Sequence, residues 1–426
     1  MRLARAIVLL GVSAALIAQQ VDPTELLVHA AQLLADRAKR LPDYTCVQTV
    51  DRLYFKRRRH TYVPRSCDQI LSLDPHTLAV ESTDRLRLDL KVSQGLEVGS
   101  WVGLPFTQRN IFEMVGGGPY GTGMLGAFIS DIFSAGGATY TYAGLEKQSD
   151  RTVAVFRFQV PASASHYQVK AGANWVATAY SGSFWLDPKT AELHRLEVQT
   201  HDLPPETDAC EAVTTVDYEK SKVGTGEFLL PSRSSLLMVM QDESETESTA
   251  VYAGCHEYHG ESTIHFDQVP GSVAPAKDAS PAAPLPPGLT FTLAFTAPID
   301  TDTAAAGDVI AAKLRHPIRD PKSKAALAPA GAHVTGRIVQ LQHWLSEPWR
   351  FKVSIMLESV EFGGQSRPLY AKIVRIPSML ESIAVPPPGQ PAWVAAFLFP
   401  TEKKRYRVPA GYESTWITIE APDKRP

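Results

Sequence analysis

The chain begins with a basic segment followed by an almost purely apolar one. Arg2 and Arg5 precede residues 7–17, which carry only small or apolar side chains apart from one serine, and further small residues follow around Ala18. This pattern is typical of a secretory signal peptide, because the apolar run is too short to span a bilayer as a permanent helix. We therefore predict a signal peptide over residues 1–18. The mature chain is expected to be periplasmic or secreted and to have no transmembrane segment.

Two further segments have the periodicity of helices. Between Asp22, a suitable N-cap, and Pro42, which ends the pattern, apolar residues recur about every 3.6 positions. This predicts an amphipathic helix. A shorter apolar pattern surrounds Phe128 and Ile132 and is bounded by glycines at 116–118 and 136–137. It predicts either a helix that plugs a hydrophobic concavity between glycine hinges or a core helix that closes a curved sheet.

Residues 44–266 otherwise show the alternation of β-strands. Residues 152–160 alternate and are rich in Val and Phe, and residues 182–198 have the pattern of a hairpin that turns at Asp187 to Thr190. Strand-like segments continue at 213–218, 228–240 and 250–266. The fold class that this pattern predicts is α+β, an antiparallel meander with packed helices.

A change of composition divides the chain. Residues 270–287 are mostly Pro, Ala and Ser, which predicts an extended, semi-rigid linker. After it come only short strands with Gly and Pro between them, typical of a small all-β barrel or sandwich. We predict domains at 19–269 and 288–426 joined by the linker 270–287. In the second domain, Trp393 to Phe399 is either a buried strand or an interface.

Composition and charge narrow the function classes. The 426 residues are 44% hydrophobic and 20% charged, which is ordinary globular composition, and their net charge of -3 argues against a nucleic-acid binder. The dense basic run from Lys56 to His60 falls at a predicted hairpin tip. There it is either solvated or in contact with anionic head groups or an acidic partner.

The chain has four cysteines, and an exported chain folds in an oxidising compartment. An even number of cysteines in such a compartment predicts two disulfides. A hairpin that turns between Lys56 and Arg57 would bring Cys46 and Cys67 face to face, so we predict that bond. The pairing of Cys210 with Cys255 stays open, because the predicted strand at 228–240 lies between the strands that carry these two cysteines.

Several motifs with catalytic or cofactor chemistry are present only in part. Gly121, Gly123 and Gly126 match the spacing of a dinucleotide fingerprint, but no βαβ pattern surrounds them, so we interpret them as hinges. Cys255, Glu257 and His259 share one face of a predicted strand and could hold a metal, yet the H-E-x-x-H spacing is missing. We interpret this segment as a polar strand face and predict no metal and no cofactor.

Nucleophilic catalysis has no motif either. The chain has no G-x-S-x-G elbow, and Tyr180-Ser-Gly-Ser183 is the nearest approach. Asp300, Asp302 and Asp308 could form a calcium or acid/base set, but at turns and strand ends aspartate commonly bonds the local backbone. The sequence therefore predicts a protein that is not an enzyme.

The first predicted domain resembles a known family. One helix, then a long antiparallel meander with a Trp-Leu-Asp-Pro-Lys-Thr-x-x-Leu hairpin at Trp185 to Leu193, resembles the half-barrel of the lipoprotein-carrier superfamily. The resemblance covers Val21 to Phe266, although the glycine-rich insert and the cysteines depart from the pattern. It implies a periplasmic protein whose curved sheet wraps around helices and holds acyl chains.

The second predicted domain resembles another group. The segments Leu285 to Gly288, Pro298 to Thr303 with Gly307-Asp308, and Pro329 to Gly336 are similar to the β-barrel of conjugation and type IV secretion channel subunits. Those subunits also carry a membrane-crossing helix, so a channel role is not implied here. Neither resemblance implies a catalytic residue.

The function that these patterns predict is an exported bacterial envelope protein that binds an acyl chain or another apolar ligand in its first domain. The alternatives are an envelope scaffold or assembly protein that holds protein partners through its β domains, and, less favoured, a metal-dependent or other hydrolase. The predicted lining residues are apolar and come from the helix and three strands: Phe128, Ile129, Ile132, Phe133, Phe156, Phe158, Trp185 and Leu196.

Overall fold

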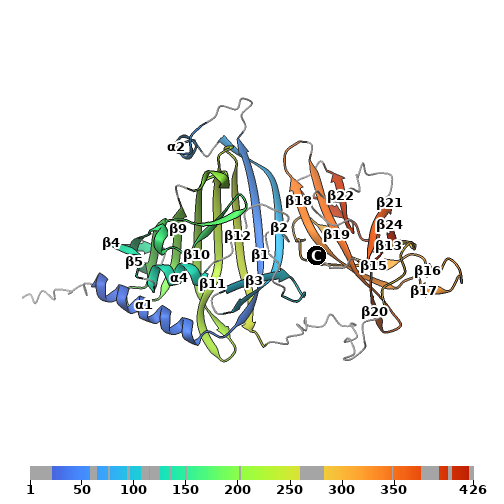
Figure 1. The fold of residues 1–426 in the computed structure, drawn as a ribbon, viewed down its shortest axis with the longest axis horizontal. Coiled ribbons are helices and arrows are strands. Elements are labelled where there is room, and N and C mark those ends of the chain that lie inside the picture. Colours follow the sequence, from blue (N-terminus) through green and yellow to red (C-terminus); the bar gives the residue numbers. More distant parts are fainter. Residues whose placement is uncertain are drawn as a thin grey trace, which may run out of the picture.

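The computed structural model describes residues 22–57, 65–74, 77–93, 96–106, 115, 125–134, 136–148, 151–200, 203–259, 283–347, 349–375, 393–401 and 405–421. The protein is mostly antiparallel β-sheet with few helices, as the sequence predicts (Figure 1). The predicted signal peptide and most of the predicted linker lie outside the described residues. None of the described helices has the length and apolar character needed to cross a bilayer.

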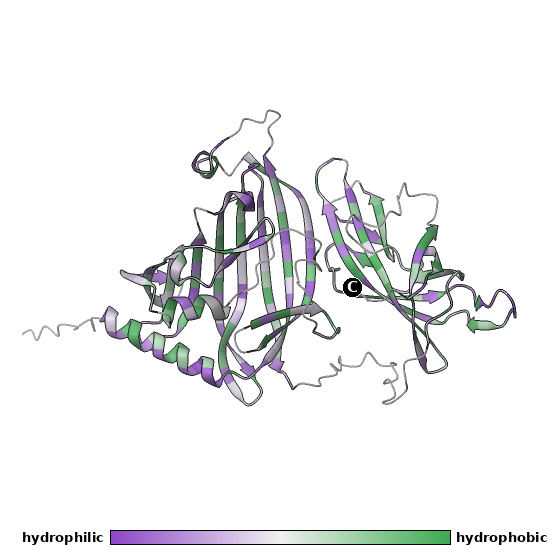
Figure 2. Ribbon diagram, in the orientation of Figure 1, coloured by the Kyte–Doolittle hydropathy of each residue, from purple (hydrophilic) through white to green (hydrophobic). Residues whose placement is uncertain are grey.

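The three described α-helices are α1 (Pro23–Arg40), α2 (Cys67–Leu71) and α4 (Leu125–Phe133), and two 3-10 helices are η2 (Ala162–Ala164) and η3 (Pro205–Thr207). The beginning of α1 confirms the predicted cap, because the Asp22 carboxylate accepts from the backbone N–H of Thr24 at 2.8 Å. Its apolar stripe faces the protein through Leu26, Ala30 and Leu34, while the opposite side is polar (Figure 2). The amphipathic prediction is confirmed.

Ten strands form the first part of the sheet. In spatial order they are β4 (Thr139–Gln148), β5 (Arg151–Val160), β8 (Tyr180–Leu186), β9 (Leu193–Thr200), β10 (Ala209–Val223), β11 (Gly226–Met240), β12 (Glu245–Glu257), β1 (Tyr44–Arg57), β2 (Leu78–Ser93) and β3 (Leu96–Trp101). All these pairings are antiparallel. The predicted β8–β9 hairpin is confirmed, and its turn is held by the Asp187 carboxylate, which accepts from the N–H groups of Lys189 and Thr190 at 2.8 Å each.

The C-terminal strands confirm the predicted short β segments. They are β13 (Thr290–Phe295), β15 (Val309–Leu314), β18 (His333–Trp344), β19 (Arg350–Phe362), β20 (Gln365–Pro368), β21 (Ala371–Arg375), β22 (Val394–Pro400) and β24 (Glu413–Thr418). Their neighbours run in the order β22–β19–β18–β15–β13–β24–β21, with β20 beside β22 on β19. The apolar run ending at Phe399 is the buried strand β22, so the strand alternative for it is confirmed.

Three two-stranded sheets complete the β structure. They pair β6 (Gln168–Ala171) with β7 (Asn174–Ala177), β14 (Ile299–Asp300) with β23 (Arg407–Val408), and β16 (Ile318–Arg319) with β17 (Ala326–Ala328). The turn role predicted for the aspartates is confirmed for Asp300 and Asp308. Asp300 accepts from the N–H of Asp302 at 3.0 Å, and Asp308 accepts from the N–H of Ala305 at 2.9 Å.

The two parts of the chain are joined by more than the linker. Strand β18 pairs with the beginning of β2, where Trp344 lies opposite Ser82, and β3 pairs with the other end of β2. Between these two pairings, the N–H of Ala306 donates to the carbonyl of Arg85 at 2.8 Å. Buried side chains of both parts belong to one continuous apolar core. The C-terminal strands are therefore docked on the edge of the first part of the sheet.

The disulfide pairing predicted from the sequence is wrong. The two bonds join Cys46 to Cys255 and Cys67 to Cys210. The hairpin partner of β1 is β2, which begins only at Leu78, because α2 lies between them in the chain. Cys46 therefore lies near the beginning of β1, whereas Cys67 follows the far end of that strand, in α2. The part of β1 between Cys46 and Arg57 alone spans roughly 35 Å at about 3.3 Å per residue.

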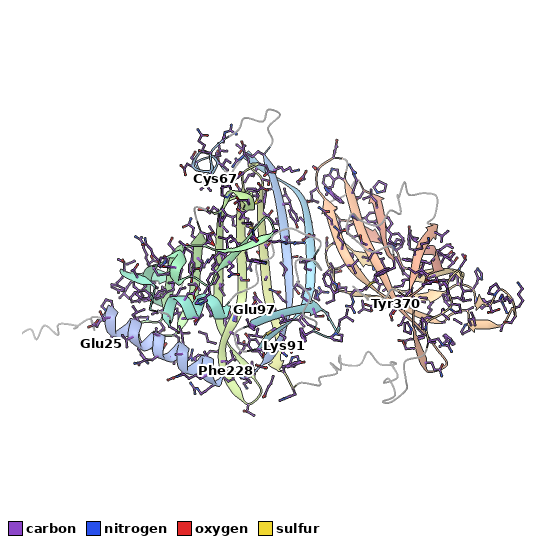
Figure 3. The ribbon with its side chains drawn as sticks, in the orientation of Figure 1. Glu25, Cys67, Lys91, Glu97, Phe228 and Tyr370 are labelled. Carbon is purple, nitrogen blue, oxygen red and sulfur yellow. A yellow bond between two sulfur atoms is a disulfide. The ribbon has the colours of Figure 1, made fainter. Side chains whose placement is uncertain are left out.

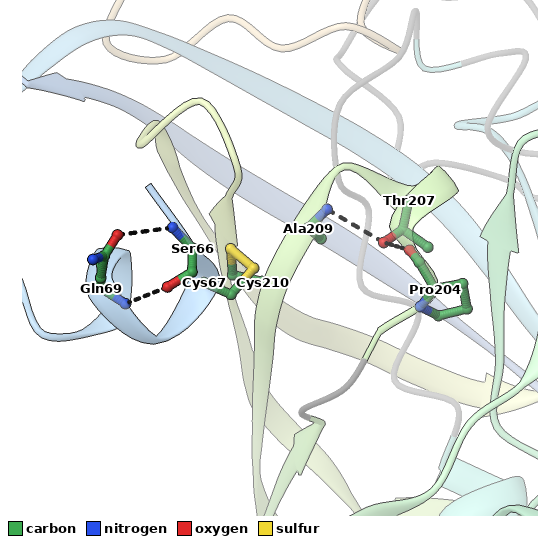
Figure 4. Close-up of a disulfide and its surroundings, with 7 residues drawn as sticks. All are labelled: Ser66, Cys67, Gln69, Pro204, Thr207, Ala209 and Cys210. Atoms are coloured by element: carbon green, nitrogen blue, oxygen red, sulfur yellow. Dashed lines mark hydrogen bonds between the residues drawn. A yellow bond between two sulfur atoms is a disulfide. The ribbon is translucent and has the colours of Figure 1, made fainter. Parts of the chain in front are cut away.

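Each observed disulfide has a local reason. Cys46 lies at a register shift of β1 against β12, beside Gly254, whose φ of 62° is the left-handed conformation that glycine adopts readily. Cys67 is the first residue of α2, and the bond to Cys210 attaches that helix to β10 (Figure 4). Ser66 and Gln69 cap α2 with bonds of 3.4 and 3.1 Å. The prediction of two disulfides is confirmed.

Candidate apolar ligand site

One face of the first part of the sheet is covered by α1 and α4, and we call it the inner face. Directly paired residues of antiparallel strands share a face, so the registers define a row that crosses eight strands. This inner row runs through Phe156, Phe184, Leu196, Val216, Ser234, Ala250, Val50 and Leu86. All eight residues are buried. The row changes from aromatic rings at the β5 end to small side chains at β11 and β12.

The predicted lining residues gather at the aromatic end of this row. Five of them are buried in one cluster beneath α1 and α4, and two more are partly buried against it; these seven are Phe128, Ile132, Phe156, Phe158 and Leu196, with Ile129 and Phe133. Trp185 is the exception, because it points to the opposite face, where it donates to Glu146 at 3.4 Å and stacks beneath Arg195. The structure therefore brings seven of the eight together.

The aromatic rings of this cluster touch one another. The ring centroid of Phe184 lies 5.2 Å from that of Phe156 and 4.9 Å from that of Phe133. The ring centroids of Phe128 and Tyr180 are 5.4 Å apart. Offset and edge-to-face contacts at such distances stabilise an apolar core beyond the area that it buries. The described part of this cluster is thus closely packed.

A glycine makes this close packing possible. Gly182 of β8 lies opposite Phe158, and a Cβ placed on it would come within 2.8 Å of the Phe158 ring and 1.9 Å of the Glu197 carbonyl oxygen. No larger residue fits there, since real Cβ atoms do not approach so closely. The ring of Phe158 therefore lies directly on the backbone of β8.

Helix α4 is anchored by one buried polar side chain. Asp131 is completely shut off from solvent, and its carboxylate accepts from the backbone N–H of His166 at 2.7 Å and from the Tyr180 hydroxyl at 3.1 Å. The same carboxylate contacts the imidazole of His166, whose side chain is 72% exposed. Burial, with the neighbouring Asp131 charge, raises the pKa of Tyr180, which keeps it a donor. Apart from this anchor, α4 is held mainly by apolar contacts.

A second polar group lies on the inner face beside the small residues. Tyr218, Tyr252 and Gln48 are the next inward-facing residues after Val216, Ala250 and Val50 on their strands. Gln48 donates its amide to the Tyr252 hydroxyl at 3.1 Å, and Ser234 Oγ lies 3.1 Å from the same oxygen.

Tyr44 and Glu97 extend this group along the edge of the sheet. Both are paired with Val92, from either side, so they share the inner face. Glu97 lies on β3 and is labelled in Figure 3. Burial raises the pKa of Tyr44, and the charge of Glu97 raises it further. Glu97 has the same effect on the pKa of Tyr218 and of Tyr252. We call Tyr44, Tyr218, Tyr252 and Glu97 the tyrosine group.

Two hollows border these residues. A cavity of about 10 Å³ lies over the small end of the inner row, where Val50, Ser234 and Ala250 line it, and has room for one water molecule. A larger groove of about 650 Å³ separates the other face of β1 and β2 from the C-terminal strands. Its walls include the ion pair Asp51–Arg85, with N and O 2.5 Å apart. The lining of the groove mixes charged side chains such as these with apolar ones such as Leu53 and Leu341.

The remaining sequence motifs are not assembled into sites. Cys255 is used in a disulfide, as anticipated for the Cys255–His259 segment, and among the described residues no three Cys, His, Asp or Glu side chains gather as metal ligands. Gly121 and Gly123 lie outside the described residues, as do residues 116–118. At the foot of the basic run, Lys56 pairs with Glu81 at 3.0 Å.

Sequence reasoning missed the polar residues of this site. Asp131 was visible as the one acidic residue within an apolar helical pattern, which is a signal of a buried anchor. Tyr218 and Tyr252 continue the alternation of their strands, but period 2 alone does not say which face of a strand is covered.

No model of a protein family matches the sequence, and no characterised protein matches it. Among solved structures, a domain described as an outer membrane lipoprotein-sorting protein from Vibrio parahaemolyticus is 12% identical, with a TM-score of 0.28; the match covers 55% of this chain and 93% of that one.

Two other solved structures are similar at the same level. A DUF1329 family protein from Desulfovibrio piger is 11% identical, with a TM-score of 0.27, over 57% of this chain and 95% of that one. The lipoprotein LppX of Mycobacterium tuberculosis is 9% identical, with a TM-score of 0.19, over 55% of this chain and 95% of that one.

Similarity this low does not assign a function, so the proposals below rest on the geometry of this chain. None of these three structures is a conjugation or type IV secretion subunit. The resemblance of the C-terminal part to those barrels stays a prediction.

Proposed function

We propose that the protein is an exported, non-catalytic envelope protein that binds an acyl chain or a similar apolar ligand on the inner face of the first part of the sheet. In this proposal residues 19–269 are an α+β half-barrel and residues 288–426 a small β-barrel domain. The observation that supports it most is the inner row, which continues from a helix-covered aromatic cluster to a floor of small side chains. Burial of a chain there contributes about 25 cal/mol per Å² of apolar surface.

Helix α4 acts as the cover in this proposal. It is short and apolar, it lies over the aromatic end of the row, and Gly136 just after it has a φ of 68°, which only glycine adopts readily. An acyl chain would replace the contacts that α4 makes with the sheet. Seven of the eight residues predicted as lining, all except Trp185, then line the site in its open state.

Replacing Asp131 by alanine is expected to favour that open state. The change leaves the Tyr180 hydroxyl and the His166 N–H without their acceptor, which costs about 2–3 kcal/mol in the closed state. The affinity for monopalmitoylglycerol or palmitate should rise by roughly 30- to 150-fold, because the ligand no longer has to break these hydrogen bonds to open the site. Displacement of a fluorescent acyl probe measures it. Ser130→Ala, at the exposed neighbouring position, is the control, and unchanged affinity in folded Asp131→Ala would contradict the role of α4.

The ligand path is tested at the small end of the row. Ala250 is buried on the inner face, whereas Val251 is 46% exposed on the other face. Ala250→Leu places a larger side chain at the small end of the inner row, where overpacking costs about 1–3 kcal/mol, and is expected to reduce acyl binding by at least tenfold. The control Val251→Leu is expected to leave acyl binding unchanged. Native mass spectrometry with monopalmitoylglycerol and palmitate measures the bound fraction. If neither wild type nor Asp131→Ala takes up either lipid, the proposal is wrong.

The scaffold alternative is favoured by a different observation. Among the described strands β4 pairs only with β5, so one edge of the sheet is open, and Leu145 on it is 51% exposed. A partner strand can add to such an edge through main-chain hydrogen bonds. A lipid-free protein that binds no acyl ligand, together with a partner whose binding is lost on placing proline at Leu145, would favour this function.

A further inference from the structure

The tyrosine group contains a buried donor without a partner. Tyr218 is only 7% exposed, and among the described residues its hydroxyl has no hydrogen-bond partner. A buried hydroxyl without a partner is costly, so a water, an ion or a ligand is expected to satisfy it. Its ring belongs to the apolar cluster beneath α1 and α4, together with Val216 and Leu196. Tyr218 is therefore the polar end of that cluster.

The neighbours of Tyr218 show which chemistry would satisfy it. Burial keeps Tyr44, Tyr218 and Tyr252 protonated, so their hydroxyls are donors at neutral pH. The Tyr252 oxygen already accepts from Gln48. What the group lacks is an acceptor for the O–H of Tyr218. The negative charge of Glu97 nearby disfavours an anionic acceptor, such as a carboxylate or phosphate.

Resting on the proposed function, we propose that the tyrosine group binds the neutral carbonyl of an esterified or amide-linked acyl chain. The carbonyl oxygen would accept from the Tyr218 hydroxyl, and the chain would run from there over Val216 into the aromatic cluster. The protein thereby distinguishes an acyl ester or amide from the free fatty acid. No bond is made or broken in this recognition.

The experiment compares two ligands with the same chain, monopalmitoylglycerol and palmitate, by displacement of a fluorescent acyl probe from the full mature protein. We expect wild type to bind the neutral ester at least tenfold more tightly than the anion. Tyr218→Phe should weaken ester binding about five- to tenfold, the effect of one lost hydrogen bond, and change palmitate binding less than twofold. Tyr167→Phe, another tyrosine packed against the same apolar cluster, is the control and should leave both affinities unchanged.

A stability measurement separates recognition from structure. Removing a buried hydroxyl that has no partner should raise the Tm of the ligand-free protein, even though ester binding falls. A structural role for the hydroxyl would lower the Tm instead. Equal binding of ester and anion by wild type, or an unchanged ester affinity in Tyr218→Phe, overturns this inference alone. Absence of binding by both ligands overturns the proposed function and this inference with it.

Discussion

Replacing Arg337 by alanine is expected to lower the free energy of unfolding by about 3–5 kcal/mol and to separate the unfolding of the two parts of the sheet. Arg337 lies on β18 with its side chain 3% exposed. Its Nε donates to Glu358 at 2.7 Å, and its Nη1 donates to the carbonyls of Val102 and Gly307 at 2.7 and 2.6 Å. Alanine leaves the partly buried Glu358 carboxylate and two carbonyls without this donor, at the point where the C-terminal strands meet the end of β3.

Calorimetry of wild type and Arg337→Ala measures this effect. We expect the variant to unfold at a lower temperature and in two transitions, since the parts no longer share this contact. The matched control is Arg315→Ala, which removes an exposed pair with Glu413 and should cost no more than about 1 kcal/mol. A single transition at the wild-type temperature in Arg337→Ala would contradict the role of Arg337 as a joint.

Removing the Cys46–Cys255 disulfide is expected to cost about 2–5 kcal/mol. The bond closes a loop of 209 residues in sequence separation, so it restricts the unfolded chain strongly. It also connects β1 to β12, which pair with each other. In chain order these are the first and the last strand of the first part of the sheet. Both partners contact an apolar cluster that includes Tyr44 and Leu230. Cys46→Ala with Cys255→Ala preserves most of that packing and isolates the effect of the covalent bond.

Urea denaturation, followed by fluorescence and circular dichroism, measures the change in the free energy of unfolding. The comparison variant, Cys67→Ala with Cys210→Ala, opens a loop of similar length, 143 in separation, but releases only α2 from β10. The urea concentration at the midpoint of unfolding should be lower for both variants than for the wild type. Only the variant without the Cys46–Cys255 bond should also have a changed strand content. Non-reducing peptide mapping of the wild type checks the pairing itself. A linked pair of peptides carrying Cys46 and Cys67 would contradict the structure.

Disulfide pairing shows where sequence reasoning was limited. The prediction placed a direct hairpin after the basic run, although the capping pair Ser66 and Gln69 marked a helix there. Once α2 lies between β1 and β2, Cys67 cannot reach Cys46. The pairing of Cys210 with Cys255 stayed open in the prediction because a strand was expected between theirs, and β11 does lie between β10 and β12.

The lining residues show a second limit. Phe184, Trp185 and Leu186 are all large and apolar, so alternation alone could not say which of them face the helices. The register of β8 with β5 and β9 decides it: Phe184 lies opposite Phe156 and Leu196 on the inner face. Trp185 is consequently on the other side. The missed residue of the cluster was Phe184, its most central ring.

Short-range features were determined by the sequence itself. The beginning of α1 at Asp22, the hairpin turn at Asp187, the helix around Phe128 and the short strands after residue 288 all depend on neighbours within a few positions, whose preferences act locally. Tertiary structure alone decided the disulfide partners, the docking of β18 on β2, the composition of the inner row and the unpaired hydroxyl of Tyr218. These depend on strand register and on contacts between residues far apart in the chain, and no local preference encodes them.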